Sequence, residues 1–213
     1  MTLERTVMRE RIKELVIERI LDGTYKPGER VVELQLVNEL NVSQAPVREA
    51  LRDLEAMRFI ESQPYRGARV RAVTAEELGE TYPVRAALEE LAGQLAAVKV
   101  DENLIAKLES EIDGMRTAAR AQDQHELLVH DARFHELIVE AAENSVLLEA
   151  WSGLRIEVFT LVSMVKAHLD LVAIPDSHLP ILDALREGDP TLVGKELRTH
   201  IESFGALVTG ADT

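Results

Sequence analysis

The stretch that most constrains this chain is residues 41–57, NVSQAPVREALRDLEAM, because it carries two different stripes at helical spacing. Ser43 is a good N-cap, and Pro46 would fall in the first turn, where a missing N–H is tolerated. An apolar stripe then recurs at 0, +3, +4 and +7, as on a helix face turned to a core: Val47, Ala50, Leu51 and Leu54. A polar stripe of Gln44, Arg48 and Arg52 would point outward. The pattern predicts a surface helix with exposed guanidinium groups.

The residues on either side of this helix predict a DNA-binding arrangement. Before it, residues 32–40 form a second short amphipathic pattern, separated from the Ser43 cap by Asn41 and Val42 alone. Two helices joined by a tight turn make a helix-turn-helix, whose second helix can enter the major groove. The alternative interpretation is an ordinary amphipathic helix with solvated arginines.

A basic β-wing is predicted after the second helix. Residues 59–73, FIESQPYRGARVRAV, suggest two short strands around a turn at 64–67, with arginines alternating against small apolar residues. Residues 30–31 would add a short strand at the base of this wing. Helix, tight turn, arginine helix and basic wing in this order favour DNA binding over the alternative.

The net charge of the whole chain opposes nucleic-acid binding, but the distribution of that charge does not. The chain carries −14, but residues 1–75 carry +1 and the remainder carries −15. A near-neutral head can still bind phosphate locally. The chain contains no cysteine, which excludes disulfides and thiolate metal sites. No long apolar stretch or signal pattern appears, so we expect a cytoplasmic protein without a membrane segment.

A second domain is predicted to begin at a capping box formed by Thr74 and Glu77. The whole chain has 213 residues, of which 46% are hydrophobic, and these values suit two domains, which we place at 1–73 and 74–213. Beyond the boundary every apolar pattern has the helical period. We expect helices at 75–98, 102–120, 124–143, 146–172, 178–187 and 190–208. The predicted fold is mainly α: a winged helix-turn-helix followed by an antiparallel all-α bundle.

Ionisable residues lie on apolar faces of three of these helices. Asp131 and His135 are one turn apart on the stripe that 125–142 would bury, and His200 lies on the core stripe of the last helix. His178 begins a short helix on the side of its apolar residues. A buried, unpaired carboxylate would cost several kcal/mol, so something must compensate it.

The four side chains would suit a divalent metal. Three imidazoles and one carboxylate can bind zinc, nickel, manganese or iron with positions left open for a ligand oxygen. The alternative is a self-contained salt bridge of Asp131 with His135 and a core histidine at 200 bonded to a carbonyl. His125, His130 and His168 fit the buried face less well, and we interpret them as incidental.

The first third of the chain resembles the GntR family of bacterial transcription regulators. PGER at 27–30, VS at 42–43, PVREAL at 46–51 and RGA at 66–68 are similar to its winged-helix motifs in sequence and order. The family usually has Arg-Thr where this chain has Gln44-Ala45. The resemblance implies that DNA is contacted by residues of the second helix and the wing: Arg30, Ser43, Gln44, Arg48, Arg52, Arg66 and Gly67, the last letting the wing approach the minor groove.

The remainder resembles the ligand-binding domain of the FCD branch of that family. The similar segments are VRAALE at 84–89, D-x-x-F-H at 131–135, and His178 followed by ILDALREGD and then His200. By resemblance, Asp131, His135, His178 and His200 would bind a divalent metal, with zinc, nickel or manganese expected. The effector would be a small organic acid, bound by Arg85 with Asn144 and Arg155 as further candidates. A bulky acyl-thioester is associated with members that lack these metal ligands.

The resulting hypothesis is a metabolite-responsive transcription regulator, expected to repress. Two copies would pair through the acidic helical domain and bind a palindromic operator in double-stranded DNA. One rival hypothesis is a metal-dependent hydrolase or oxygenase acting on a small acid, since a histidine-rich site can activate water or oxygen. Another is a DNA-binding scaffold whose polar cluster is purely structural.

Overall fold

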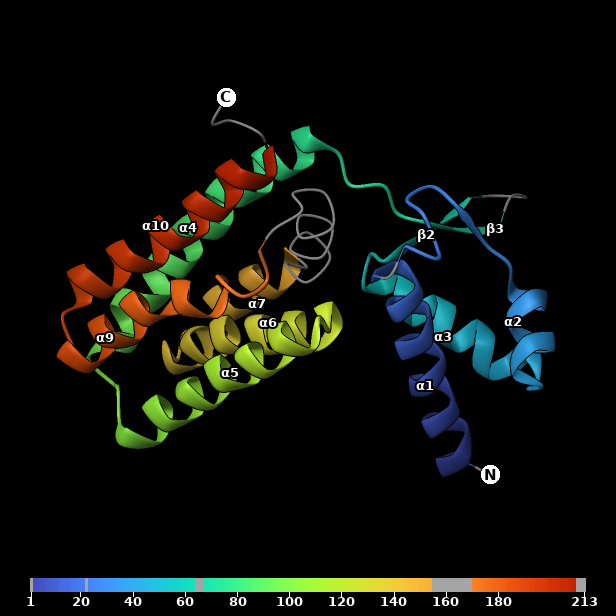
Figure 1. Ribbon diagram of the computed structural model, residues 1–213, viewed down its shortest axis with the longest axis horizontal. Coiled ribbons are helices and arrows are strands. Elements are labelled where there is room, and N and C mark those ends of the chain that lie inside the picture. Colours follow the sequence, from blue (N-terminus) through green and yellow to red (C-terminus); the bar gives the residue numbers. More distant parts are fainter. Residues whose placement is uncertain (1, 22, 64–66, 155–169, 210–213) are drawn as a thin grey trace. The chain divides into compact units, whose positions relative to one another are not determined.

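The chain forms two units, Met1–Val73 and Thr74–Thr213, each with its own core. The computed structural model describes residues 2–21, 23–63, 67–154 and 170–209 (Figure 1). At the start of the second unit Thr74 Oγ1 accepts a hydrogen bond from the Glu77 backbone N–H (3.1 Å), and the Thr74 N–H donates to the Glu77 carboxylate (3.0 Å). The predicted capping box is therefore present.

The first unit is a winged helix-turn-helix. Its elements in order are α1 (Thr2–Leu21), β1 (Arg30–Val31), α2 (Glu33–Leu40), α3 (Gln44–Ala56), β2 (Ile60–Gln63) and β3 (Gly67–Val70). The turn between α2 and α3 is tight because Asn41 adopts a left-handed conformation (φ 51°) and donates its N–H to the Val37 carbonyl. On α3, Val47, Ala50 and Leu54 of the predicted apolar stripe are fully buried, whereas Leu51 is half-buried.

The three strands form one antiparallel sheet in the order β1-β3-β2. Arg30 pairs with Arg69 across β1 and β3, and Ile60 pairs with Val70 across β2 and β3. The sheet thus contains the predicted wing and the predicted short strand at its base. The residues expected at the wing turn, 64–66, lie outside the described residues.

The second unit is an antiparallel helical bundle. Its described elements are α4 (Ala75–Ala97), α5 (Glu102–Ala121), α6 (Gln124–Ala141), α7 (Ser145–Gly153), the 3-10 helix η1 (Pro175–His178), α9 (Leu179–Glu187) and α10 (Pro190–Thr209). Figure 1 shows α10 running back along α4, and α6 running back along α5. The fold class predicted from sequence is confirmed.

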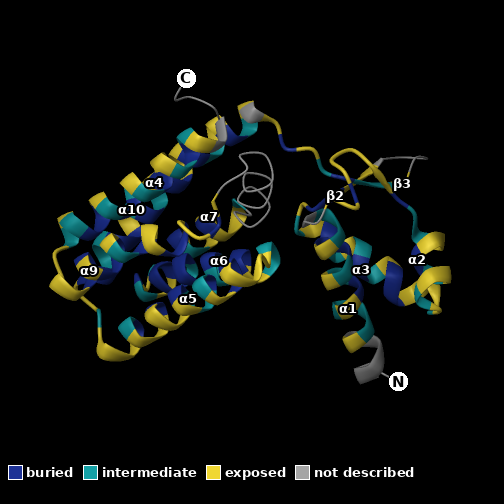
Figure 2. Cartoon of the chain, in the orientation of Figure 1, coloured by how far each residue is buried: buried dark blue, intermediate teal, exposed yellow. Residues whose placement is uncertain are grey.

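Close approach of α4 and α10 depends on glycine. A Cβ added at Gly93 would lie 2.4 Å from a methyl carbon of Leu197, and one added at Gly194 would lie 2.8 Å from Gln94. In Figure 2 the buried residues of this unit lie on the faces that its helices turn to one another. An apolar cluster joins α4, α5, α6, α9 and α10: its fully buried members include Leu108, Met115, Phe134, Ile181 and Leu197.

The prediction of one helix over 146–172 is wrong at its C-terminal end. The helix α7 ends at Gly153, residues 155–169 lie outside the described residues, and residues 171–174 form a turn. The Asp170 side chain accepts a hydrogen bond from the Val172 N–H (3.0 Å), which offers the backbone an alternative to helix. Pro175 then starts η1. Within the described residues, no helix is both long and apolar enough to cross a membrane.

Candidate nucleic-acid interface and metal centre

The basic face of the first unit is a concave surface between α3 and the wing. A hollow of about 530 Å³ is lined by residues from α2, α3 and all three strands, among them Arg30, Arg48, Arg52 and Gly67. Gly67 has a positive φ of 77°, and a Cβ there would lie 3.5 Å from the Arg30 guanidinium. The wing backbone therefore passes close to a cation, as a surface that approaches phosphate requires.

The arginines of α3 are exposed but are not equivalent. Arg48 Nε contacts Glu33 Oε1 at 2.8 Å, and its Nη2 donates to Gln44 Oε1 at 3.4 Å. Arg52 makes no ion pair with any described residue. Ser43 occupies the N-cap position of α3, but its hydroxyl makes no capping hydrogen bond with the described chain. Arg66 lies outside the described residues.

In the second unit the histidines expected to bind a metal lie close together. One nitrogen from each of His135, His178 and His200 lies within 4.8 Å of the other two, and the rings of His178 and His200 are 4.4 Å apart between centroids. Asp131 adjoins them, because its Oδ1 is 3.2 Å from His178 Nε2. Three segments, α6, η1 and α10, thus bring the four residues to one place.

The buried nitrogens of this cluster are available to a cation. Among the described residues, His135 Nε2 has no hydrogen-bond partner, whereas His135 Nδ1 faces Glu89 and His178 Nε2 faces Asp131. His178 Nδ1 lies 3.0 Å from the Ile174 carbonyl, and a proton on Nδ1 would donate to that oxygen and leave the Nε2 lone pair for a cation. Two ligands of one cation, each about 2.0 to 2.2 Å from it, lie about 2.8 to 3.6 Å apart. The 3.2 Å between Asp131 and His178 fits that spacing.

Electrostatics favour the forms that bind metal. Burial, together with the neighbouring rings of His178 and His135, holds the pKa of His200 well below its usual range, so the ring is neutral at pH 7. For Asp131, burial opposes ionisation, but its contacts with His178 and His135 outweigh burial and hold the pKa of the carboxyl well below its usual range. A neutral imidazole and an ionised carboxylate are the states that coordinate divalent metals.

Behind the cluster lies a buried polar network that sequence reasoning missed. Glu89 on α4 is 1% exposed, and its Oε2 is 2.6 Å from His135 Nδ1. Its Oε1 accepts hydrogen bonds from Arg85 Nε (2.7 Å) and from the Trp151 indole N–H (2.9 Å). Burial opposes ionisation of Glu89, but Arg85 and His135 outweigh it, so the pKa of this carboxyl lies well below its usual range. The available signal was the four-residue spacing of Arg85 and Glu89.

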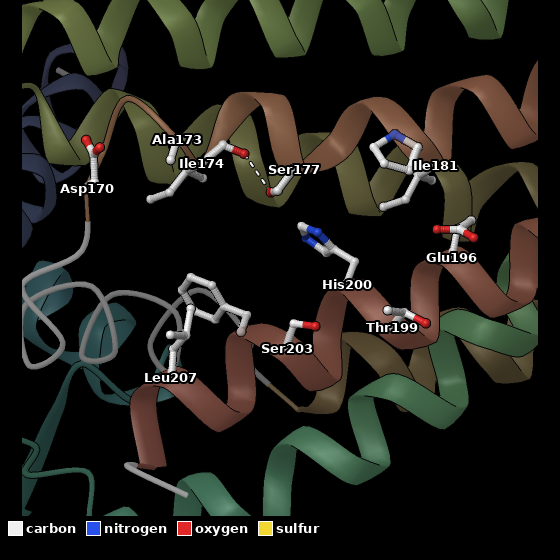
Figure 3. A pocket seen from close by; sticks show the side chains of 12 residues that line it. Asp170, Ala173, Ile174, Ser177, Ile181, Glu196, Thr199, His200, Ser203 and Leu207 are labelled. Atoms are coloured by element: carbon white, nitrogen blue, oxygen red, sulfur yellow. Dashed lines mark hydrogen bonds between the residues drawn. The ribbon is translucent and has the colours of Figure 1, made fainter. Parts of the chain in front are cut away.

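A cavity of about 500 Å³ opens beside the cluster between η1, α9 and α10. In Figure 3 the His200 ring projects from α10 toward the segment that carries Ser177, with Asp170 and Glu196 at opposite ends of the view. The walls are mainly apolar, with hydroxyl groups contributed by Ser177, Thr199 and Ser203. His200 is the shared member of the cavity and the histidine cluster.

The three residues expected to bind the effector do not lie together in the described structure. Arg85 is buried behind His135 and is not among the described residues that line this cavity. Asn144 caps α7, because its side chain accepts a hydrogen bond from the Leu147 N–H at 3.1 Å. Arg155 lies outside the described residues.

The fold and the exposed basic groove define a winged-helix DNA-binding protein with a C-terminal helical domain. Two family models match the chain: bacterial regulatory proteins of the gntR family over residues 8–70, and the FCD domain over residues 80–203. The chain belongs to the GntR family of transcription regulators and carries its FCD domain.

Relatives and solved structures agree with this assignment. The chain is 35% identical to the "Probable D-xylose utilization operon transcriptional repressor" of Paenarthrobacter nicotinovorans, over 95% of this chain and 89% of that one. It is 32% identical to the gluconate operon transcriptional repressor of Bacillus licheniformis, over 89% and 80%. The fold matches E. coli McbR/YncC with a TM-score of 0.76 at 21% identity, covering 97% and 99% of the two chains. A GntR regulator of Rhodococcus sp. RHA1 matches at 0.71 and 25%, covering 96% and 99%.

These relatives are transcription regulators, and the family is not a family of enzymes. The rival hypothesis of a metal-dependent hydrolase or oxygenase therefore has no support.

Proposed function

We propose that this chain is a transcriptional repressor whose operator binding is controlled by a small carboxylate effector held at a divalent metal centre in the second unit. The observation that carries the proposal is the convergence of three histidines and Asp131 at one buried place, where His135 Nε2 lacks a hydrogen-bond partner in the described chain. Leaving such a buried group unpaired costs about 1 to 3 kcal/mol, so a bound cation explains its placement.

His135, His178, His200 and Asp131 would hold the metal, and zinc, nickel or manganese suits this set of nitrogen and oxygen donors. The metal would supply positive charge and open positions for oxygen ligands. His178 is oriented for this role by the Ile174 carbonyl.

We place the effector in the cavity that His200 shares with the cluster. Asp170 and Glu196 would repel an anion from the ends of the cavity, so a carboxylate should bind near His200, between them. We keep Arg85 as a candidate for the effector carboxylate, a role that requires its guanidinium to leave the ion pair with Glu89. Asn144 and Arg155 are weaker candidates for the same role. Relatives named for D-xylose and gluconate operons favour an acid from sugar metabolism.

We further propose that two copies pair through their helical units and place two α3 helices on a palindromic operator in the cytoplasm. Effector binding would favour one conformer of the dimer and DNA the other. Coupling of this kind is typically about 1 to 3 kcal/mol, which is about 5- to 150-fold in affinity.

The test is operator binding, with operators selected from random DNA by the purified protein. Metal-loaded protein is titrated with a panel of sugar acids and dicarboxylates, and fluorescence anisotropy reports DNA binding. We expect at least one acid to change operator affinity in the parent and not in His200→Ala. His130→Ala is the matched control, since His130 contacts Glu111 outside the cluster. A response that persists in His200→Ala would contradict the proposed site.

A further inference from the structure

The carboxylate of Glu89 is shared by three helices of the second unit. It comes from α4, its Oε2 contacts His135 on α6, and its Oε1 accepts the indole N–H of Trp151 on α7. All three side chains are buried. A single side chain therefore connects the histidine cluster to a helix that contributes none of its members.

The charges around Glu89 determine what it can do. Arg85 on the same helix lies 2.7 Å from Oε1, so the Arg85–Glu89 pair is neutral by itself. His135 consequently needs no positive charge of its own to remain beside Glu89. A neutral His135 with its proton on Nδ1 would direct that proton to Oε2 and leave the Nε2 lone pair for coordination. Carboxylates behind metal-binding histidines orient the ring in this way.

We propose that Glu89 is a positioning residue that holds His135 with Nε2 toward the histidine cluster and transmits occupancy of that cluster to α7 through Trp151. The inference rests on the proposed metal centre and adds two features to it. Metal affinity should depend on a residue that is not a ligand, and an indole outside the site should sense binding.

The chain contains a single tryptophan, so Trp151 supplies the whole indole emission. Zinc is the suitable probe because it is redox-inactive and has a filled d shell, so any emission change reports the surroundings of the indole. We expect zinc added to chelator-treated, full-length protein to change this emission. In Glu89→Gln, we expect zinc affinity by calorimetry to fall about 10- to 100-fold and the emission change to be lost.

Glu111→Gln is the matched control. Glu111 Oε2 lies 2.7 Å from His130 Nδ1 on the same helix α6, so this variant breaks a similar contact away from the cluster. It should bind zinc as the parent does. Parent-like affinity and emission in Glu89→Gln would overturn the inference. A parent that binds no zinc would instead refute the metal centre itself, and the inference with it.

A measurement on the unmodified protein covers the case in which Glu89→Gln does not fold. Nitrogen-15 spectra of the histidine rings, recorded with zinc bound, identify the protonated and the coordinated nitrogen of each ring. We expect His135 to keep its proton on Nδ1 and to coordinate through Nε2. Coordination through Nδ1 would place the metal on the side of Glu89 and overturn the proposal.

Discussion

Replacing Glu33 by glutamine should tighten operator binding. Glu33 lies in the first turn of α2 and contacts Arg48 Nε at 2.8 Å on the surface that also carries Arg52 and Arg30. It therefore competes with phosphate for the Arg48 guanidinium and adds negative charge where DNA would dock. The substitution removes both effects while keeping the size of the side chain.

The magnitude follows from the exposure of this pair. The side chains of Arg48 and Glu33 are 58% and 29% exposed, so the pair is a surface ion pair worth about 0.2 to 1 kcal/mol. Releasing Arg48 from it should strengthen binding by about 1.4- to 5-fold. Because the effect is electrostatic, the gain should shrink as salt is raised.

The assay is fluorescence anisotropy with a labelled operator at two salt concentrations. Glu14→Gln is the matched control, since it removes the same charge from an exposed position on α1 that does not line the basic groove. Circular dichroism checks that α2 remains folded. If Glu33→Gln binds no better than Glu14→Gln, Arg48 does not face DNA as inferred.

The other predictions concern both units. Arg52→Ala should weaken operator binding by about 1 to 3 kcal/mol if Arg52 reads a guanine. The loss should exceed that of Arg48→Ala, because Arg52 has no competing ion pair in the described chain, and operator titrations of the two variants compare the losses. Zinc at about 100 times its dissociation constant should stabilise chelator-treated protein by about 2.7 kcal/mol, measured by thermal melting, and should not stabilise His178→Ala/His200→Ala. The pKa of His200 in the folded protein lies below its unfolded value of about 6.5, so the folded protein should lose stability as the pH falls below about 6.5. Urea titrations of metal-free protein should show this loss of stability, and the loss should be smaller in His200→Gln. Gly93→Ala should destabilise the bundle by about 1 to 3 kcal/mol because its methyl group would collide with α10, and equal urea midpoints for variant and parent would refute that packing.

The elements that sequence predicted best are those with local signals. The capping box at Thr74 and Glu77 involves residues three apart, and the stripes of α3 recur within four turns. Such patterns need no knowledge of the rest of the fold. The proximity of the histidines could also be predicted, because ionisable residues on the apolar stripes of three helices require buried partners and a shared site is one way to supply them.

The features that could not be predicted from the sequence depend on tertiary contacts. Glu89 lies 62 residues from Trp151 and on a different helix from His135, so its spacing to Arg85 resembles an ordinary helical ion pair. Its buried role arises only when α4, α6 and α7 pack together. Likewise, the apolar period after α7 suggested a continuous helix, whereas the turn at Asp170 is fixed by a side-chain hydrogen bond.

The most direct test of the proposed function is the metal content of the protein as purified, without added metal or chelating resin. Elemental mass spectrometry would compare the parent, the His178→Ala/His200→Ala variant and the His130→Ala control. Near-stoichiometric zinc, nickel or manganese in the parent and the control, lost in the double variant, is the predicted result. Absence of metal from the parent, together with an unchanged melting temperature on adding these metals, would contradict the proposed centre and leave the cluster a structural network.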